Sequence, residues 1–362
     1  MRTRAGLLLA VCASLATGCA ATRRPDDRAF RTLEPLIDAT GVSGMEGPVR
    51  DTVRTLLPSW TDPEVDDAGN LLVRVGSGSP TKLFIAHLDE IGYGVKEIDE
   101  HGMLTLSKKG GFFDSLYEGQ PVLVFRRDRG PVAGVVVPRP GYRSATTAAP
   151  KLEELVVDIG ATSKREAEQD VAPGDTVTIR KDLQHLVGER ATARSFDDRV
   201  GCASLLLALE RLDRQKVKGT VVFAFSTGEE VGLDGAKALS TRLRPDVVFA
   251  VDTFVSADSP REIDRFAYAP IGAGAVVRAL DHSNAAPKWA VAKVLEIAAS
   301  HRIPMQYGVT GGGNDGSVFT RFGAIDVPLA WPLRYSHSPA EVVDLRDVAA
   351  LGQLVAALAE DF

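Results

Sequence analysis

The chain has 362 residues, of which 44% are hydrophobic and 25% are charged, the proportions of an ordinary soluble globular protein. This length predicts one large domain with an insertion, or two domains. The formal net charge of −6 excludes the basic footprint typical of nucleic-acid-binding proteins, so no nucleic-acid partner is expected. Of the three cysteines only Cys202 lies beyond the first 19 residues, which excludes an intramolecular disulfide framework in the rest of the chain.

The N-terminus has the pattern of an export signal. Arg2 and Arg4 form a basic segment, and the apolar run over residues 5–16 is too short to cross a bilayer as a helix. The run ends at Gly18 and Cys19, which resembles a bacterial lipobox, where the cysteine is diacylated and becomes the mature N-terminus. We therefore expect an exported bacterial lipoprotein, anchored through Cys19 to a membrane and facing the periplasm or the cell exterior.

Cleavage by ordinary signal peptidase is the alternative, because Ala16 stands where a lipobox usually has leucine. In either case residues 1–18 are predicted to be a signal peptide. The polar stretch that follows contains Pro25 and predicts a tether over residues 19–30.

Helical and buried-strand patterns alternate along most of the remaining chain, which predicts an α/β fold with a mixed sheet between helices. Helical spacing covers residues 33–57 (interrupted by Gly41 and Gly44), 202–212, 288–299 and 345–358, the last capped by Asp344. Ser43 to Glu46 has the sequence of a capping box. Buried strands are predicted over residues 83–86, 221–225, 247–251 and 324–331.

The pattern changes between residues 95 and 187 to short alternating runs separated by Gly and Pro. The runs include residues 121–125, 132–137, 155–159 and 176–179. This spacing is typical of a small all-β domain. Since the α/β pattern resumes afterwards, we predict a β-domain over residues 95–187 that is inserted into a catalytic domain made of residues 31–94 and 188–362.

Each predicted buried strand is followed by acidic or histidine residues. These residues are His87 and Asp89, Glu229 and Glu230, Asp252, and His337. In open α/β sheets, ligands bind just outside the carboxyl ends of the strands. Taken singly, each residue has an ordinary explanation, such as Glu in a first helical turn or a histidine in the core.

Two pairs among these residues suggest specific roles. His87 and Asp89 project to the same side of an extended chain, so that one can bind a metal while the other orients it. Paired carboxylates such as Glu229 and Glu230 can act as a metal ligand and a general base. A further acid pair, Asp197 and Asp198, opens a predicted helix, where acids usually serve as caps.

Together, two histidines and several carboxylates at one sheet edge match the ligand preference of a dinuclear Zn, Mn or Co site with one bridging carboxylate. The residues alone therefore indicate a two-metal hydrolase. The sequence contains neither a Gly-x-Ser-x-Gly nucleophile elbow nor a His-Glu-x-x-His motif.

Five segments in order also resemble the motifs of the glutamyl-aminopeptidase or tetrahedral aminopeptidase family. They are residues 86–92, 197–201, 229–236, 251–252 and 337–341. The resemblance runs from about residue 33 to the end of the chain, and in that family the inserted domain is PDZ-like.

The resemblance implies roles for individual residues. It implies His87, Glu230, Asp252 and His337 as terminal ligands of two divalent metals, Zn or else Co or Mn, with Asp197 bridging both. It also implies Glu229 as the general base, Asp89 as the partner that orients His87, and a cis peptide bond between Asp197 and Asp198.

The activity implied is removal of N-terminal residues from peptides with a free amino terminus, in a homo-oligomer. Other cocatalytic amidohydrolases (a deacylase or a carboxypeptidase), relatives labelled endoglucanases, and a non-catalytic metal- or peptide-binding lipoprotein are the alternatives. Two segments depart from the family pattern: residues 313–316, Gly-Asn-Asp-Gly instead of Gly-Thr-Asp-Ala, and residues 140–143 of the insertion, where a His-Leu pair is normal.

Overall fold

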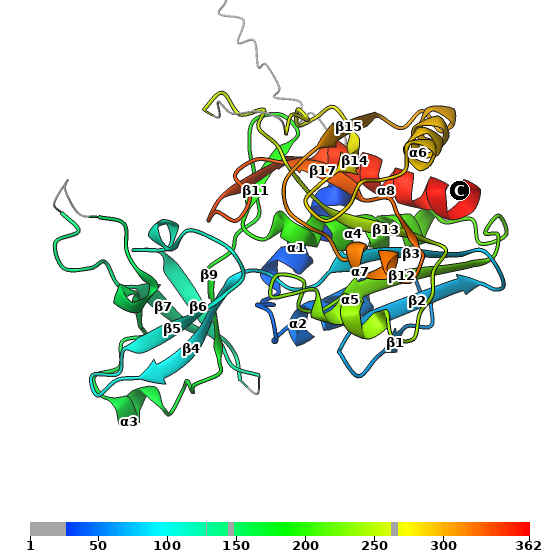
Figure 1. Cartoon of the computed structure of the whole chain (residues 1–362). Coiled ribbons are helices and arrows are strands. Elements are labelled where there is room, and N and C mark those ends of the chain that lie inside the picture. The colour runs from blue at the N-terminus through cyan, green and yellow to red at the C-terminus, as the bar shows by residue number, and fades with distance from the viewer. Residues whose placement is uncertain (1–26, 128, 144–147, 262–266) are drawn as a thin grey trace, which may run out of the picture.

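The computed structural model describes residues 27–127, 129–143, 148–261 and 267–362. The chain forms a large α/β domain with a smaller β-domain beside it (Figure 1). The predicted signal peptide, Cys19 and most of the predicted tether lie outside the described residues. Of the helices in the described part of the chain, none has the length and apolar character that crossing a membrane requires.

Helix α1 begins earlier than the sequence predicted. The helices are α1 (Asp27–Asp38), α2 (Gly47–Leu56), α3 (Lys164–Ala167), α4 (Phe196–Arg211), α5 (Asp234–Leu239), α6 (Lys288–Ser300), α7 (Ser317–Thr320) and α8 (Leu345–Asp361), with short 3₁₀ helices η1 (Asp114–Leu116) and η2 (Leu152–Glu154). Residues 27–30 of the predicted tether thus belong to α1. They are helical because Ala29 continues the buried face of Leu33 and Leu36.

A mixed sheet of nine strands runs through the large domain, in agreement with the predicted fold class. In spatial order the strands are β1 (Glu64–Val65), β2 (Leu71–Gly76), β12 (Thr220–Ser226), β3 (Thr81–His87), β13 (Val247–Val255), β17 (Leu329–Leu333), β14 (Ala275–Leu280) and β15 (Met305–Val309), and β16 (Ile325–Asp326) also pairs with β13. Strands β12, β3, β13 and β17 are parallel, so their carboxyl ends lie at one edge of the sheet.

Helices cover both faces of this sheet. Along β3 successive side chains point to opposite faces. Phe84 packs in a cluster that includes α1, α2, α4, α6 and α8, whereas Leu83 and Ile85 pack in a second cluster with α5 and α7. Burial on both faces explains why the central strands are almost continuously apolar.

The β-domain is a closed barrel with its own core. Its strands, in order around the barrel, are β4 (Gly92–Ile98), β5 (Leu104–Lys109), β8 (Val156–Asp158), β7 (Val132–Val136), β6 (Pro121–Phe125) and β9 (Thr176–Ile179). The predicted boundary at residue 95 falls inside β4, because Gly92 and Tyr93 already pair with β5. The likeness to a PDZ domain stays a prediction.

The chain returns from the barrel into a small third sheet. This sheet consists of β10 (Gln184–His185), β11 (Arg190–Ala193) and β18 (Glu341–Asp344). Strand β11 leads directly into α4, and β18 leads directly into α8, whose first turn is capped by the Asp344 side chain as predicted. The third sheet therefore connects the start of α4 to the C-terminal segment.

Two local predictions were wrong. Strand β13 does not end before Asp252 but continues to Val255, because residues 252–255 pair with β17. The predicted capping box at α2 is absent. Glu46 is the N-cap residue without a side-chain cap bond, and the Ser43 hydroxyl donates to Asp89 instead.

Candidate active site

Two groups of histidine and carboxylate side chains meet at the carboxyl edge of the parallel strands. One group is His87, Asp197 and Asp252, and the other is Asp197, Glu230 and His337. In each group the possible ligand atoms lie within 4.8 Å of one another. The residues come from the end of β3, the start of α4, strand β13 and the segments after β12 and β17. The structure therefore brings together all five predicted metal ligands.

Asp197 lies between the two groups. Its Oδ1 is 3.1 Å from Nε2 of His87, and its Oδ2 is 3.3 Å from Nε2 of His337. Oε1 of Glu230 is also 3.3 Å from Nε2 of His337. One carboxylate oxygen of Asp197 faces each group, which is the arrangement expected of a residue that bridges two cations.

The site carries more negative charge than the protein itself offsets. Burial, with a contribution from neighbouring carboxylates, raises the pKa of Asp252 to about 6 and raises the pKa of Glu230. Burial disfavours the charged form of His337, but Glu230 and Asp197 outweigh it and raise the pKa of His337 to about 12. The site thus favours bound positive charge.

These residues fit divalent cations. Oε1 of Glu230 is buried and makes no hydrogen bond. Such an acceptor is costly unless something occupies it. Imidazole nitrogens and carboxylate oxygens are also the donors that Zn, Mn and Co accept.

Asp89 makes more contacts than the sequence suggested. Its Oδ1 is 3.4 Å from Nδ1 of His87, so it can orient that ring. Its carboxylate also accepts hydrogen bonds from the backbone N–H of Glu229 at 3.0 Å and of Glu230 at 3.2 Å, and from the Ser43 hydroxyl at 2.6 Å. One buried side chain thus positions the His87 ring and the loop that carries both glutamates.

Asp198 acts through the backbone. Its Oδ2 accepts a hydrogen bond from the backbone N–H of His87 at 2.9 Å, and its Oδ1 accepts one from Gly201 at 2.9 Å. Asp198 is absent from both groups of possible ligands. The peptide bond between Asp197 and Asp198 is cis, as the family resemblance implied.

A cavity of about 410 Å³ opens above these residues. It is lined by Gly111, Phe112, Phe113, Leu116, Asp197, Glu229, Glu230, Asp252, Thr253, Val255, Arg278, Gly311, Gly312, Gly313, Ser336 and His337. Glu229 lies on its floor, with Oε2 at 4.0 Å from Nε2 of His87. Burial raises the pKa of Glu229 well above its usual value, and this favours a carboxyl group that can hold a proton. A larger cavity of about 1000 Å³ between the domains contains none of the predicted ligands.

The sequence matches one protein family over most of its length. Residues 69–354 match the model of the M42 glutamyl aminopeptidase family. The chain belongs to this family. Its relatives include a protein of Acetivibrio thermocellus named "Putative aminopeptidase", 32% identical over 88% of this chain and 94% of the relative. They also include the lysyl aminopeptidase of Pyrococcus furiosus, 29% identical over 92% of this chain and 97% of the relative.

Solved structures agree with this M42 assignment. The aminopeptidase of Desulfurococcus kamchatkensis superposes with a TM-score of 0.87 at 32% identity, covering 92% of this chain and 95% of that chain. The TET1 peptidase of Pyrococcus horikoshii superposes with a TM-score of 0.86 at 35% identity, covering 92% of this chain and all of that chain. The protein is a metallo-aminopeptidase, as the motifs suggested.

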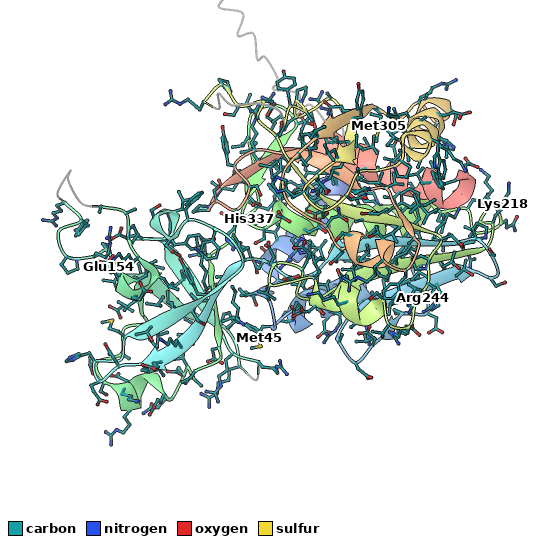
Figure 2. All side chains as sticks on the ribbon, in the orientation of Figure 1. Met45, Glu154, Lys218, Arg244, Met305 and His337 are labelled. Atoms are coloured by element: carbon teal, nitrogen blue, oxygen red, sulfur yellow. The ribbon has the colours of Figure 1, made fainter. Side chains whose placement is uncertain are left out.

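A loop of the inserted barrel contacts the candidate active site, which the sequence did not predict. The ring of His337 lies at the junction of the two domains (Figure 2). Its Nδ1 is 2.5 Å from the carbonyl oxygen of Gly111, a residue just beyond β5. Phe113 and Leu116 extend the same wall of the cavity. No sequence pattern links these residues to the site, because the contact depends on how the domains pack.

The departure at residues 313–316 has a local explanation. A Cβ atom at Gly316 would collide with the carboxylate of Asp326. Asn314 donates a hydrogen bond from its side chain to Asp281 at 2.9 Å, and Arg278 joins Asp281 to Asp252. A larger residue at position 316 would therefore require the Asp326 side chain to move. The second departure lies away from the site, since residues 140–143 do not line the cavity.

Proposed function

We propose that this protein removes the N-terminal residue of peptides by means of two divalent cations, with Glu229 as the general base. The observation that carries the proposal is the position of Asp197, which belongs to both groups of possible ligands. His87, Asp197 and Asp252 would hold one cation, and Asp197, Glu230 and His337 would hold the other. When bound, such cations polarise a peptide carbonyl and make a water molecule more acidic.

Proton transfer is assigned to Glu229. It lines the cavity but belongs to neither ligand group, and its pKa is raised by burial. Glu229 would take a proton from the attacking water and return it to the leaving amine. Asp89 would keep Glu229 in place through the backbone hydrogen bond that it accepts.

The cavity supports a preference for apolar first residues. The exposed side chains of Phe113 and Val255, together with Leu116, lie around the cavity that contains Glu229. The one Arg or Lys side chain in its lining, Arg278, is buried and paired with Asp252 and Asp281. We propose that substrates beginning with Leu, Met or Phe are cleaved faster than those beginning with Glu or Lys.

A panel of chromogenic aminoacyl substrates tests this function. The protein, loaded in turn with Zn, Co and Mn, is assayed on each substrate with its amino group free and with its amino group acetylated. Protein from which a chelator has removed the metal is the control. Cleavage of the free forms only, lost on chelation, is the expected result. Release of acetate from the acetylated forms would indicate a deacylase, and release of the last residue from an unblocked peptide would indicate a carboxypeptidase. No cleavage with metal bound would indicate a binding protein. A soluble cellulose derivative tests for endoglucanase activity.

Self-association is proposed from a relative. The TET1 peptidase of P. horikoshii can assemble into a tetrahedron or a large octahedral shell. We infer that this chain also forms a homo-oligomer. Light scattering coupled to size-exclusion chromatography tests this inference, and a monomer at micromolar concentration would contradict it.

Export and lipidation are proposed from the N-terminal sequence alone. Support comes from the basic segment, the short apolar run and Cys19. Two acyl chains would give stable membrane attachment. Fractionation of cells producing the wild type and Cys19→Ala tests the proposal, which fails if the wild type is soluble and begins at another residue.

A further inference from the structure

Glu341 connects the two segments that carry Asp197 and His337. It is the first residue of β18 and is paired with Ala193 of β11. Ala193 lies two residues before Ser195, the N-cap residue of α4. Its side chain is buried, with only 2% of the residue exposed. The carboxylate is therefore held on a strand, close to both segments, and shielded from water.

Each carboxylate oxygen accepts a backbone hydrogen bond from a different segment. Oε2 accepts from the N–H of Phe196 at 2.7 Å, with the N–H of Asp197 at 3.5 Å. Oε1 accepts from the N–H of His337 at 2.9 Å. These hydrogen bonds therefore hold the backbone at or next to Asp197 and His337, whose side chains face the same candidate cation position.

Both segments have backbone conformations that are unfavourable for their residue types. Ser195, Tyr335 and His337 have φ angles of 69°, 62° and 60°, in the left-handed region. Residues with a Cβ atom seldom adopt that region unless the surrounding structure holds them there. The hydrogen bonds that Glu341 accepts from Phe196, the residue after Ser195, and from His337 supply such a constraint.

We propose that Glu341 is a positioning residue for the metal centre: it fixes the backbone at Phe196 and His337, so that the side chains of Asp197 and His337 converge. Glu341 does not line the cavity that contains Glu229 and belongs to neither ligand group. The inference rests on the proposed function, because it assumes that Asp197 and His337 hold a cation.

Metal affinity is the measurement that separates this role from a merely structural one. The full chain and its Glu341→Gln variant are equilibrated with chelator-buffered zinc, and bound metal is measured by elemental analysis. Glutamine is nearly the same size, but its NH₂ group faces one of the two N–H donors, so one hydrogen bond is lost. We expect one of two metal equivalents to bind about 10 to 100 times more weakly, as for other residues that orient ligands. Excess zinc should restore part of kcat.

Asp344→Asn is the matched control. Asp344 lies on the same strand and is equally buried, but its carboxylate bonds Arg346 at the start of α8. This variant should unfold at a lower temperature and bind zinc as the wild type does. Zinc affinity of Glu341→Gln within threefold of the wild type, or equal weakening in Asp344→Asn, would overturn the inference.

A measurement on the wild type covers the case in which the variants do not fold. Amide hydrogen exchange at Phe196 and His337 should be slow in the metal-free protein, because both N–H groups are bonded to Glu341. Fast exchange at either amide would contradict the proposal. A wild type that binds no metal would instead refute the proposed function, so the two failures are distinguishable.

Discussion

At the scale of single residues, Glu229 and Glu230 are neighbours with different surroundings. Oε1 of Glu230 is buried, makes no hydrogen bond and lies 3.3 Å from His337, whereas Glu229 belongs to neither ligand group. In Glu229→Gln we expect kcat to fall by roughly 10² to 10⁴ with metal content intact, because the amide cannot accept a proton. Glu230→Gln should lose metal first and recover part of its activity in excess metal.

Metal analysis beside kcat decides between these roles. A Glu229→Gln protein within a few-fold of wild-type activity would refute the assignment of the base. Metal loss in Glu229→Gln but not in Glu230→Gln would mean that the two roles are exchanged.

The adjacent acids Asp197 and Asp198 make a second pair with opposite expectations. Asp197→Ala should lose bound metal, since one side chain contributes to both groups. Asp198→Ala should keep more metal but lose stability, by about 1–3 kcal/mol for buried N–H groups of His87 and Gly201 left without acceptors. Elemental analysis and thermal unfolding of both variants provide the test. Equal metal content in the wild type and Asp197→Ala would exclude a bridging role.

Much of this site could be predicted from the sequence, because strand ends of an α/β sheet gather side chains from distant segments. His87 and Asp252 follow recognisable apolar runs, so their proximity was expected. The backbone contacts of Asp89 and Glu341 could not be predicted. They depend on which oxygen meets which N–H group, and residue spacing does not encode that geometry.

At the scale of elements, the sequence located strands well where the pattern is local. Strands β6 and β9 have the predicted bounds, because Gly or Pro precedes each apolar run and charged residues follow it. The end of β13 could not be predicted, because its last residues are extended only through pairing with β17. Likewise the sequence around Ser43 predicted a cap, but Asp89, distant in sequence, competes for its hydroxyl.

Lys82 provides a test of how one element stabilises another. This lysine of β3 is 1% exposed, and its Nζ donates to the carbonyl oxygens of Leu358 at 3.3 Å and Ala359 at 2.7 Å near the end of α8. The Leu358 carbonyl also accepts from the N–H of Phe362, but carbonyls further along the last turn of a helix lack partners within it and favour a cation. Lys82→Met should therefore lower the free energy of unfolding by about 1–3 kcal/mol.

Chemical denaturation measures this difference. Lys293→Met, which alters the partly exposed partner of the Phe362 ring, is the matched control and should change stability much less. Equal stability of Lys82→Met and the wild type would show that the contact with α8 contributes nothing.

At the scale of the whole molecule, the two domains are joined where the chain passes between them. The barrel closes because six short strands pair in a ring, an arrangement that alternating runs alone do not specify. Glu90 lies on the passage into the barrel, and Lys181 lies on the passage out. The Glu90 carboxylate, with no exposed surface, is bonded to Lys181 at 2.9 Å, to Arg199 at 3.4 Å and to Arg194.

Three basic side chains surround the Glu90 carboxylate, so replacing Glu90 and replacing Lys181 should have unequal effects on stability. Removing the charge of Glu90 in Glu90→Gln leaves the buried Arg194 and Arg199 without their carboxylate and should cost about 3–5 kcal/mol. Lys181→Met leaves Arg194 and Arg199 to neutralise Glu90 but loses the hydrogen bond to the Ala39 carbonyl oxygen at 2.7 Å, so at pH 7 it should cost less stability than Glu90→Gln. Denaturation of both variants at pH 7 tests this asymmetry, and a larger loss in Lys181→Met than in Glu90→Gln would contradict it.

Lys181 should also make the free energy of unfolding depend on pH. Burial, opposed in part by Glu90, lowers the pKa of Lys181 from 10.5 to about 7 in the folded protein. Between these values the unfolded chain holds a proton that the folded protein has released, so Lys181 makes wild-type stability rise with pH over this window. Below pH 7 both states are protonated, and the penalty for burying the charge is complete. The unfolding free energy of Lys181→Met minus that of the wild type should therefore fall steadily from pH 7 to pH 10. A difference that is constant over this range would show that Lys181 is not the group responsible.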